Sequence, residues 1–187
     1  MQVTQRSYNP AWDATGSLKL LVRSVEVAMR YGIAVATMLL GLSGCAYAAK
    51  DVPVPSSCTP QVNAGLAQLI ASHTTKDVDN IMACGTATQK TRVQRGGPHG
   101  SHHVTTIAAP LPGGQTVNVQ IVTNDDLDGP VVAQVNDSVM AYGQGYISHG
   151  LWAAGIHDTH CSTHTGADNG WVVVAGVKTP KSCPNSR

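Results

Sequence analysis

Thr116-Val-Asn-Val-Gln-Ile121 is the stretch that decides the fold, because apolar and polar side chains alternate along it without a break. That period of two places Val117, Val119 and Ile121 on one face of a strand and leaves the polar residues for solvent. The polar run Asn124-Asp-Asp-Leu-Asp-Gly-Pro130 then interrupts the pattern. The stretch therefore predicts a half-buried β-strand that ends in a loop.

Four further segments with strand-like composition are separated by turn residues, and they span residues 81–92, 102–109, 138–147 and 151–157. Gly85 would bend the first of them, and Gly143 and Gly145 would bend the strand at 138–147. Five short strands with these bends are typical of the OB-fold, a small Greek-key barrel. We therefore predict a mainly β protein built on a small five-stranded OB-like Greek-key barrel. Residues 131–135 are expected to cross back over it, and residues 171–174 to add an edge strand or pack across its end.

One short helix is predicted before the strands, over residues 63–71. Leu66, Leu69 and Ile70 follow the i, i+3, i+4 spacing of a single helical face, which indicates packing on the barrel. The fold is thus expected to carry one short N-terminal helix.

The first 45 residues are predicted to be an N-terminal extension followed by a signal peptide. Residues 33–42 form a ten-residue apolar run, which is too short to span a bilayer as a helix. Leu42-Ser-Gly-Cys45 then resembles a lipobox, which predicts lipidation of Cys45, and Ala46-Tyr-Ala48 offers an ordinary cleavage site. Both indicate export, either as an outer-membrane lipoprotein facing the periplasm or as a soluble periplasmic or secreted protein. Residues 46–60 are expected to form a tether and residues 61–187 the barrel domain.

Because the chain is expected to be exported, we expect its remaining cysteines to form disulfides. These cysteines are Cys58, Cys84, Cys161 and Cys183. Four cysteines in an oxidising compartment indicate two bonds, and zinc ligation is disfavoured because no C-x-x-C pair is present. Spacing leaves three pairings open. We favour Cys84–Cys161 and Cys58–Cys183, the second of which would join the ends of the mature chain.

Charge and aromatic content disfavour a nucleic-acid partner. After Cys45 the chain has eight Lys and Arg, nine Asp and no Glu, so no basic excess is available to neutralise phosphates. The outward residues Thr116, Asn118 and Gln120 also offer no stacking surface. Membrane contact is expected only through a lipid anchor.

Residues of about 62 to 180 resemble the bacterial domain-of-unknown-function family 3465, whose members are small exported proteins. The matching pieces are Gly100-Ser-His-His103, Gly114-Gln-Thr-Val-Asn-Val119, Asp126-Leu127, Asn136-Asp-Ser-Val139 with Tyr142-Gly143, His157-x-Thr159-His160 and Gly170-Trp171. Where the family pattern has a histidine and Asp-Pro after Thr-His, this chain has Cys161-Ser162-Thr163. The resemblance implies the fold and the export, and it implies no known activity.

The candidate site residues are histidines at the end of the last barrel strand. His157, His160 and His164, with His103 and Asp158, could bind zinc or copper, because imidazole and carboxylate are common ligands of these metals. The competing interpretation is that these histidines cap the barrel end through hydrogen bonds to the backbone. A further alternative is acid–base catalysis by His103 and His160, which lie in H-x-[ST]-x-like segments.

These observations favour an exported cell-envelope binding or accessory module for an unknown ligand or protein, with a possible histidine metal site. The alternative is a small secreted hydrolase or nuclease that cleaves phosphodiesters with paired histidines. The sequence contains no G-x-S-x-G, H-E-x-x-H, P-loop or dinucleotide-binding motif.

Overall fold

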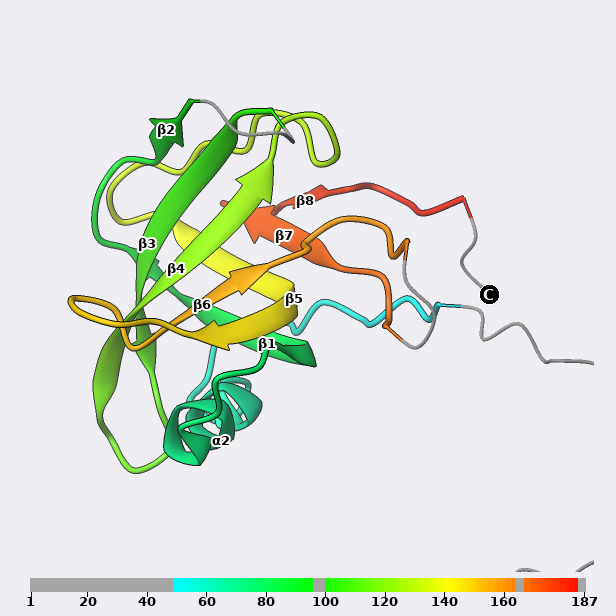
Figure 1. The fold of residues 1–187 in the computed structure, drawn as a ribbon. Helices are drawn as coiled ribbons and strands as arrows, with labels where there is room; N and C mark the ends of the chain where they lie inside the picture. Colours follow the sequence, from blue (N-terminus) through cyan, green and yellow to red (C-terminus); the bar gives the residue numbers. More distant parts are fainter. Residues whose placement is uncertain (1–48, 96–99, 164–166, 185–187) are drawn as a thin grey trace, which may run out of the picture. The chain divides into compact units, whose positions relative to one another are not determined.

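The computed structural model describes residues 49–95, 100–163 and 167–184. The predicted signal segment, Cys45 and His164 lie outside these ranges. In chain order the elements are α2 (Ala64–Ser72), β1 (Val78–Ala87), β2 (Arg92–Gln94), β3 (His102–Pro110), β4 (Thr116–Asn124), β5 (Ser138–Ile147), β6 (Ala154–His157), β7 (Trp171–Val174) and β8 (Val177–Thr179) (Figure 1).

Five of the strands close into a barrel in the order β1-β3-β4-β6-β5, and β5 pairs with β1 to complete the ring. Neighbouring strands run antiparallel except for β4 and β6, which run parallel with Ile121 opposite Ile156. Outside the ring, β2 pairs with β3, and β7 and β8 extend from β5. The structure confirms the predicted mainly β fold with a small five-stranded barrel and one short helix (Figure 1).

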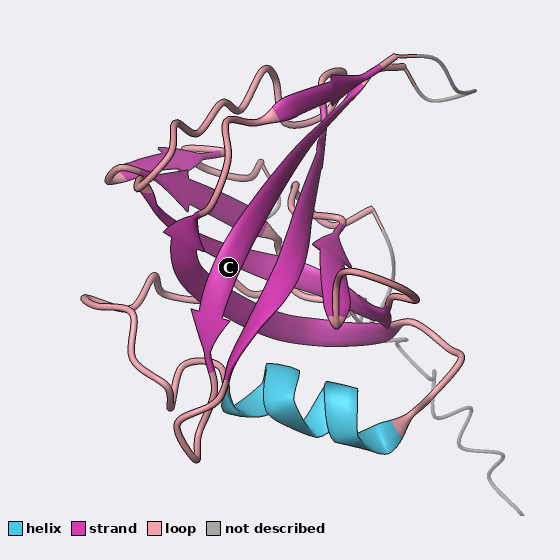
Figure 2. Ribbon diagram, turned by 90° about the vertical axis from the view of Figure 1, so that its left-hand side faces the viewer, coloured by secondary structure: helices cyan, strands magenta, loops and turns pink. Residues whose placement is uncertain are grey.

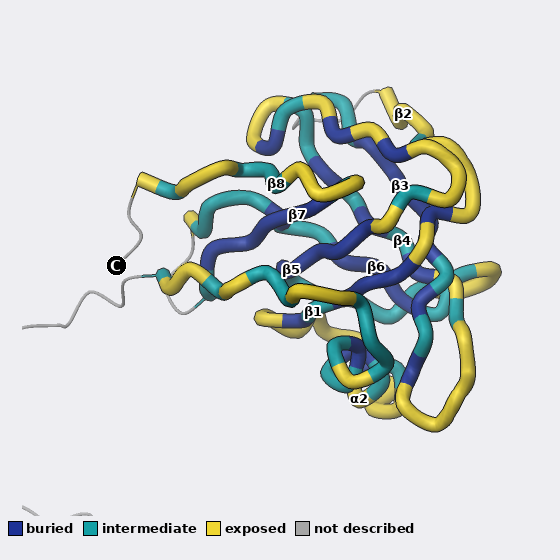
Figure 3. The backbone as a smooth tube through the Cα atoms, turned by 180° about the vertical axis from the view of Figure 1, so that it is seen from behind, coloured by how far each residue is buried: buried dark blue, intermediate teal, exposed yellow. Residues whose placement is uncertain are grey.

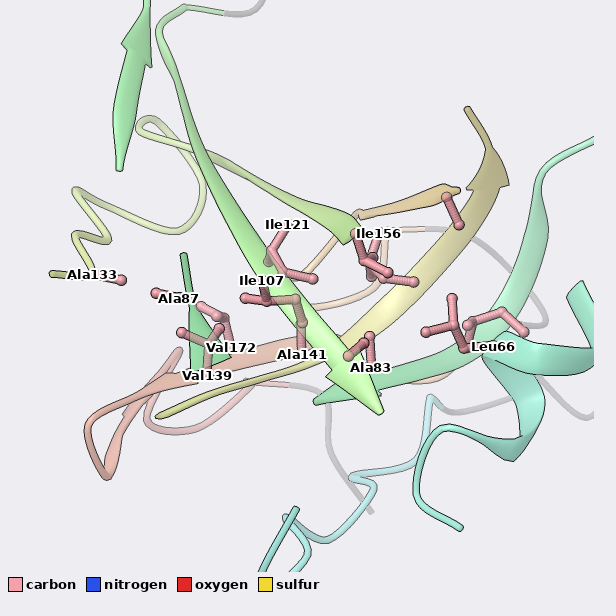
Figure 4. Packing of buried hydrophobic residues seen from close by; sticks show 14 of the residues in the cluster. Leu66, Ala83, Ala87, Ile107, Ile121, Ala133, Val139, Ala141, Ile156 and Val172 are labelled. Carbon is pink, nitrogen blue, oxygen red and sulfur yellow. The ribbon is translucent and has the colours of Figure 1, made fainter. Parts of the chain in front are cut away.

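The barrel interior is filled by the apolar face that the alternating pattern predicts. Val119 and Ile121 of β4 are fully buried, and they pack with Ile107 and Ile156 from the neighbouring strands (Figure 4). Helix α2 lies against one end of the barrel and contributes Leu66 and Leu69 to the same cluster (Figure 2). Burying a side chain of this size stabilises the fold by about 1.5–3 kcal/mol, so this core supplies much of the driving force for folding.

The predicted strand over residues 81–92 is divided in two. β1 ends at Ala87, whose backbone N–H donates to the Asp137 carbonyl, and β2 begins only at Arg92. At Gly85 the two strands approach closely, because a Cβ there would overlap the backbone carbonyl of Ala108 on β3, whereas the irregularity in the β1–β5 register lies between Val78 and Ile81. Next to Gly85, β1 changes partner: Thr86 lies opposite both Ser138 of β5 and Ala108 of β3.

An N-terminal cover segment, residues 51–62, lies across the outer face of β1, β5 and β7 (Figure 3). Its apolar side chains join a second, smaller cluster around Trp171, which is 1% exposed. The indole Nε1–H of Trp171 donates to the Val52 carbonyl at 2.8 Å. Asn63, directly after the segment, is fully buried, and its side chain donates to the carbonyls of Cys84 and Pro110 and accepts the backbone N–H of Cys84. Much of the segment predicted as a tether is therefore packed on the barrel.

The predicted disulfide pairing is wrong. The bonds are Cys58–Cys84 and Cys161–Cys183, with Cα atoms 5.5 and 5.4 Å apart, which is the usual separation. The prediction assumed that the two ends of the domain meet. Instead, the cover segment places Cys58 over β1 and beside Cys84, and the chain after β8 returns to the turn that contains Cys161.

Candidate functional site

The candidate site is a pocket of about 460 Å³ at one edge of the barrel, called the rim pocket below. It is lined by His102, Val122, Asn124, Asp126, Leu127, Asp128, His157, Asp158 and His160. The parallel pairing of β4 and β6 explains its position, because both strands end at this edge and their following turns meet there. β3 runs antiparallel to β4 and begins at the same edge, with His102 opposite Asn124.

The turn over residues 157–160, called the site turn, is held by close backbone packing. Asp158 has a left-handed backbone with φ of 52°. A Cβ at Gly143 would overlap the His157 carbonyl, and one at Gly170 would overlap the Asp158 carbonyl. Gly170 also donates its N–H to the carbonyl of His160 at 2.8 Å. These two glycines therefore allow β5 and the segment before β7 to fix the site turn from two sides.

His157 lies between two carboxylates. Its Nε2 is 3.3 Å from Oδ2 of Asp77, and its Nδ1 is 3.4 Å from Oδ1 of Asp158. Because ionised carboxylates only accept hydrogen bonds, both ring nitrogens are satisfied together only when each carries a proton. The pKa of His157 is accordingly raised, chiefly by its contact with the Asp158 carboxylate and against the effect of burial. The Tyr146 ring contacts His157 edge-on and occupies the space that a side chain at Gly155 would fill.

His160 shares the same carboxylate. Its Nε2 lies 3.7 Å from Oδ1 of Asp158, and its Nδ1 lies 2.9 Å from the carbonyl oxygen of Cys161. The contact with the Asp158 carboxylate is the largest of the effects that raise the pKa of His160. The two imidazoles in turn hold the pKa of Asp158 far below its usual range. Asp158 is thus an ionised carboxylate between two histidines that favour the protonated form.

Asp128 joins the two turns that line the pocket. It accepts the backbone N–H of Asn124 at 2.7 Å and the hydroxyl of Thr159 at 3.4 Å. Burial is the main effect on this side chain and raises the pKa of its carboxyl. Asp126, two residues earlier, is exposed, and its carboxylate has no hydrogen bond or ion pair with the described residues. The pocket therefore contains one carboxylate with a structural role and one that is open to a ligand.

His103 does not lie in the rim pocket. Its Nδ1 is 2.9 Å from the Val131 carbonyl, and its Nε2 is 3.2 Å from Oδ1 of Asp125, an ion-pair contact without hydrogen-bond geometry. Neighbouring residues of a strand point to opposite faces, so it is His102 that lines the pocket. His102, Asp126 and Asp128 line the pocket but were not among the predicted site residues. The alternation along β3 was a signal for His102, whereas no local pattern places the 124–128 turn beside the site turn.

The predicted metal group is only partly brought together. His157 and His160 line one pocket with Asp158, His103 lies apart, and His164 is outside the described residues. Within residues 49–95, 100–163 and 167–184, no three His, Cys, Asp or Glu side chains converge closely enough to hold a metal ion.

Comparison with known proteins gives no relative: no family model, no curated protein and no solved structure matches this chain. The resemblance to family 3465 stays a prediction. The fold and the site define a disulfide-bonded, OB-like β-barrel with a polar pocket at its rim.

Proposed function

We propose that this chain is an exported cell-envelope module that binds a small polar ligand in the rim pocket. The observation that carries the proposal is the pocket itself. Its volume of about 460 Å³ lies in the range of small-molecule sites, about 300–1,000 Å³. Four groups with clearly shifted pKa values, Asp128, His157, Asp158 and His160, line this pocket, and Tyr146, whose pKa is also raised, packs against His157. Such clusters mark candidate functional sites.

Export is supported by the two disulfides, which are consistent with an oxidising compartment. None of the helices in the described ranges is both long and apolar enough to cross a membrane. Lipidation at Cys45 and retention at the outer membrane complete the proposal. Fractionation of cells, with mass measurement of the mature N-terminus, tests this part directly.

The pocket lining favours an uncharged or cationic ligand. Three carboxylates and three imidazoles line it, and no Lys or Arg is present among the described lining residues. A phosphodiester would meet uncompensated negative charge at Asp126. The alternative function, phosphodiester hydrolysis by His103 and His160, is therefore less well supported, and His103 also lies outside the pocket.

The pocket geometry supports binding of zinc or copper less well than binding of an organic ligand. His157 and His160 both contact Asp158, but a metal ion would have to displace protons that these contacts stabilise. The side chains would also have to move, since no group of three ligands is formed among the described residues.

The proposal is tested by titrating the purified chain with zinc, with copper, and with a panel of uncharged and cationic small molecules. Binding is followed by calorimetry and by amide chemical shifts. We expect a ligand to shift the amides of the 124–128 and 157–160 turns, and Asp126→Asn and His160→Gln to weaken its binding. His149→Ala is the matched control, because this histidine is exposed and outside the pocket. Binding that leaves both turns unshifted, or that survives both pocket substitutions, would refute the proposal.

A further inference from the structure

The two disulfides differ in their surroundings. Cys84 is fully buried in the second hydrophobic cluster, beside Trp171 and Met140, and Cys58 packs against the same cluster. A thiolate attacking Cys58 would expel the thiolate of Cys84 into apolar surroundings, where burial disfavours the charged form. Direct attack on Cys84 is blocked by the side chains that cover it. Both routes to exchange at this bond are therefore costly while the protein is folded.

Cys161 and Cys183 are both half-buried, and neither belongs to either hydrophobic cluster. Lys181, Ser182 and Pro184 around Cys183 are exposed. Either sulfur can therefore be approached from solvent, and either can leave as a thiolate that water solvates. This bond joins the segment after β8 to Cys161, the residue that directly follows the site turn.

We propose that Cys161–Cys183 is a site of thiol–disulfide exchange, and that its reaction partner is a dithiol reductant or a thiol–disulfide oxidoreductase. In the first step a thiolate of the reductant attacks Sγ of Cys183. A mixed disulfide forms, the Cys161–Cys183 bond breaks, and Cys161 leaves as a thiolate that takes a proton from water. In the second step the other thiol of the reductant attacks the mixed disulfide and releases Cys183. The reductant is oxidised to its disulfide, and two electrons pass to the protein.

Reduction of Cys161–Cys183 leaves the barrel intact and releases only the segment after Thr179 from its attachment beside the site turn. The backbone bond from Gly170 to His160 and the bond from the Ser162 N–H to the Asn169 side chain do not involve sulfur. The pairing of β7 with β8 is also independent of the bond. The reduced protein thus keeps its pocket and loses the covalent attachment of the segment after Thr179.

The test exposes the folded, oxidised chain to graded dithiothreitol and, separately, to a thioredoxin-type dithiol protein. Free thiols are then alkylated and the labelled cysteines identified by peptide mass. We expect Cys161 and Cys183 to be labelled together, at least about tenfold faster than Cys58 and Cys84. Equal labelling rates, or earlier labelling of Cys58 and Cys84, would overturn the proposal.

Global unfolding is separated from local exchange by two additional measurements. In the Cys161→Ala/Cys183→Ala variant we expect cooperative unfolding and continued protection of Cys58 and Cys84 from the reductant. In the unaltered chain, labelling of Cys161 should not accelerate in parallel with the unfolding rate as urea is added below the transition. Labelling that follows the unfolding rate would contradict exchange in the folded state.

Discussion

The covered outer face of the barrel and its open rim contrast in almost every respect. On the outer face, the cover segment buries Trp171 and Cys84 in an apolar cluster that Cys58–Cys84 closes. At the rim, His157, Asp158 and His160 form a charged network beside a half-buried bond. The two bonds close stretches of similar length, with separations of 26 and 22 residues. The stabilisation from loop-closure entropy is therefore similar for the two disulfides, and they differ in how deeply their sulfurs are buried.

The largest expected effect comes from removing the bond on the covered face. Cys58→Ala/Cys84→Ala should lower the free energy of unfolding by about 3 kcal/mol from loop entropy, with a further 1–2 kcal/mol, roughly, from lost packing of the buried sulfur. Cys161→Ala/Cys183→Ala should lose only the loop-entropy contribution to the free energy of unfolding. Urea unfolding of both variants measures the difference. Equal losses would mean that burial does not distinguish the two bonds.

A second prediction concerns the glycines that hold the site turn. Gly170→Ala should destabilise the protein by about 1–3 kcal/mol, because the added Cβ overlaps backbone atoms that cannot move independently. Gly65→Ala is the matched control: its Cβ would meet only Ile81 Cδ1, at 4.0 Å, and alanine favours the helix. Thermal unfolding and amide shifts of residues 157–160 serve as readouts. A neutral Gly170→Ala would show that the turn is not fixed by this approach.

A third prediction is a pH dependence of stability that arises from the rim histidines and Asp158. The pKa values of His157 and His160 are raised on folding, so their stabilisation is complete below a pH of about 6.5 and is lost as the pH rises through the raised values. The pKa of Asp158 is lowered, so its contribution is present above a pH of about 3.9 and declines as the pH falls. Since Asp158 is partly exposed, each pair should contribute under about 1 kcal/mol.

Unfolding by urea between mildly acidic and alkaline pH checks this dependence. Stability should decline on the alkaline side, and the decline should shrink in His157→Gln and His160→Gln. If the free energy of unfolding changes with pH in both variants as it does in the unaltered chain, the pH dependence originates elsewhere in the molecule.

The smallest effect on stability is expected at Asp126. Asp126→Asn should change the free energy of unfolding by less than about 0.5 kcal/mol, because this exposed carboxylate has no partner among the described residues. Chemical denaturation provides the measurement. A clear stabilisation or destabilisation would show that Asp126 serves the fold instead of being available to a ligand.

The local parts of the fold were predictable from the sequence, and the long-range parts were not. The alternation at Val117, Val119 and Ile121 indicates a strand whatever surrounds it, and Leu66 and Leu69 indicate the helix in the same way. The disulfide pairing depends on where the cover segment lies, which no local pattern encodes. Pairing was therefore the main error in the predicted fold.

The site shows the same division. His157 and His160 were identified because they follow a strand, and the structure places them in one pocket. His103 was named and His102 was not, because the faces of β3 had not been assigned; the structure places His102 in the pocket and His103 outside it. The contribution of the Asn124–Asp128 turn depends on β4 and β6 being parallel neighbours, a feature of topology that short-range periodicity does not reveal.

Because β4 and β6 are parallel, the turns that follow them can change in sequence without altering the barrel core. The residues that keep the ring closed point inward along the strands, whereas the carboxylates of the pocket, Asp126, Asp128 and Asp158, belong to turns beyond the strand ends. The two turns can therefore diverge, through mutation or by design, while the hydrophobic interior stays the same. A chain of this kind can acquire a different binding preference without a new architecture.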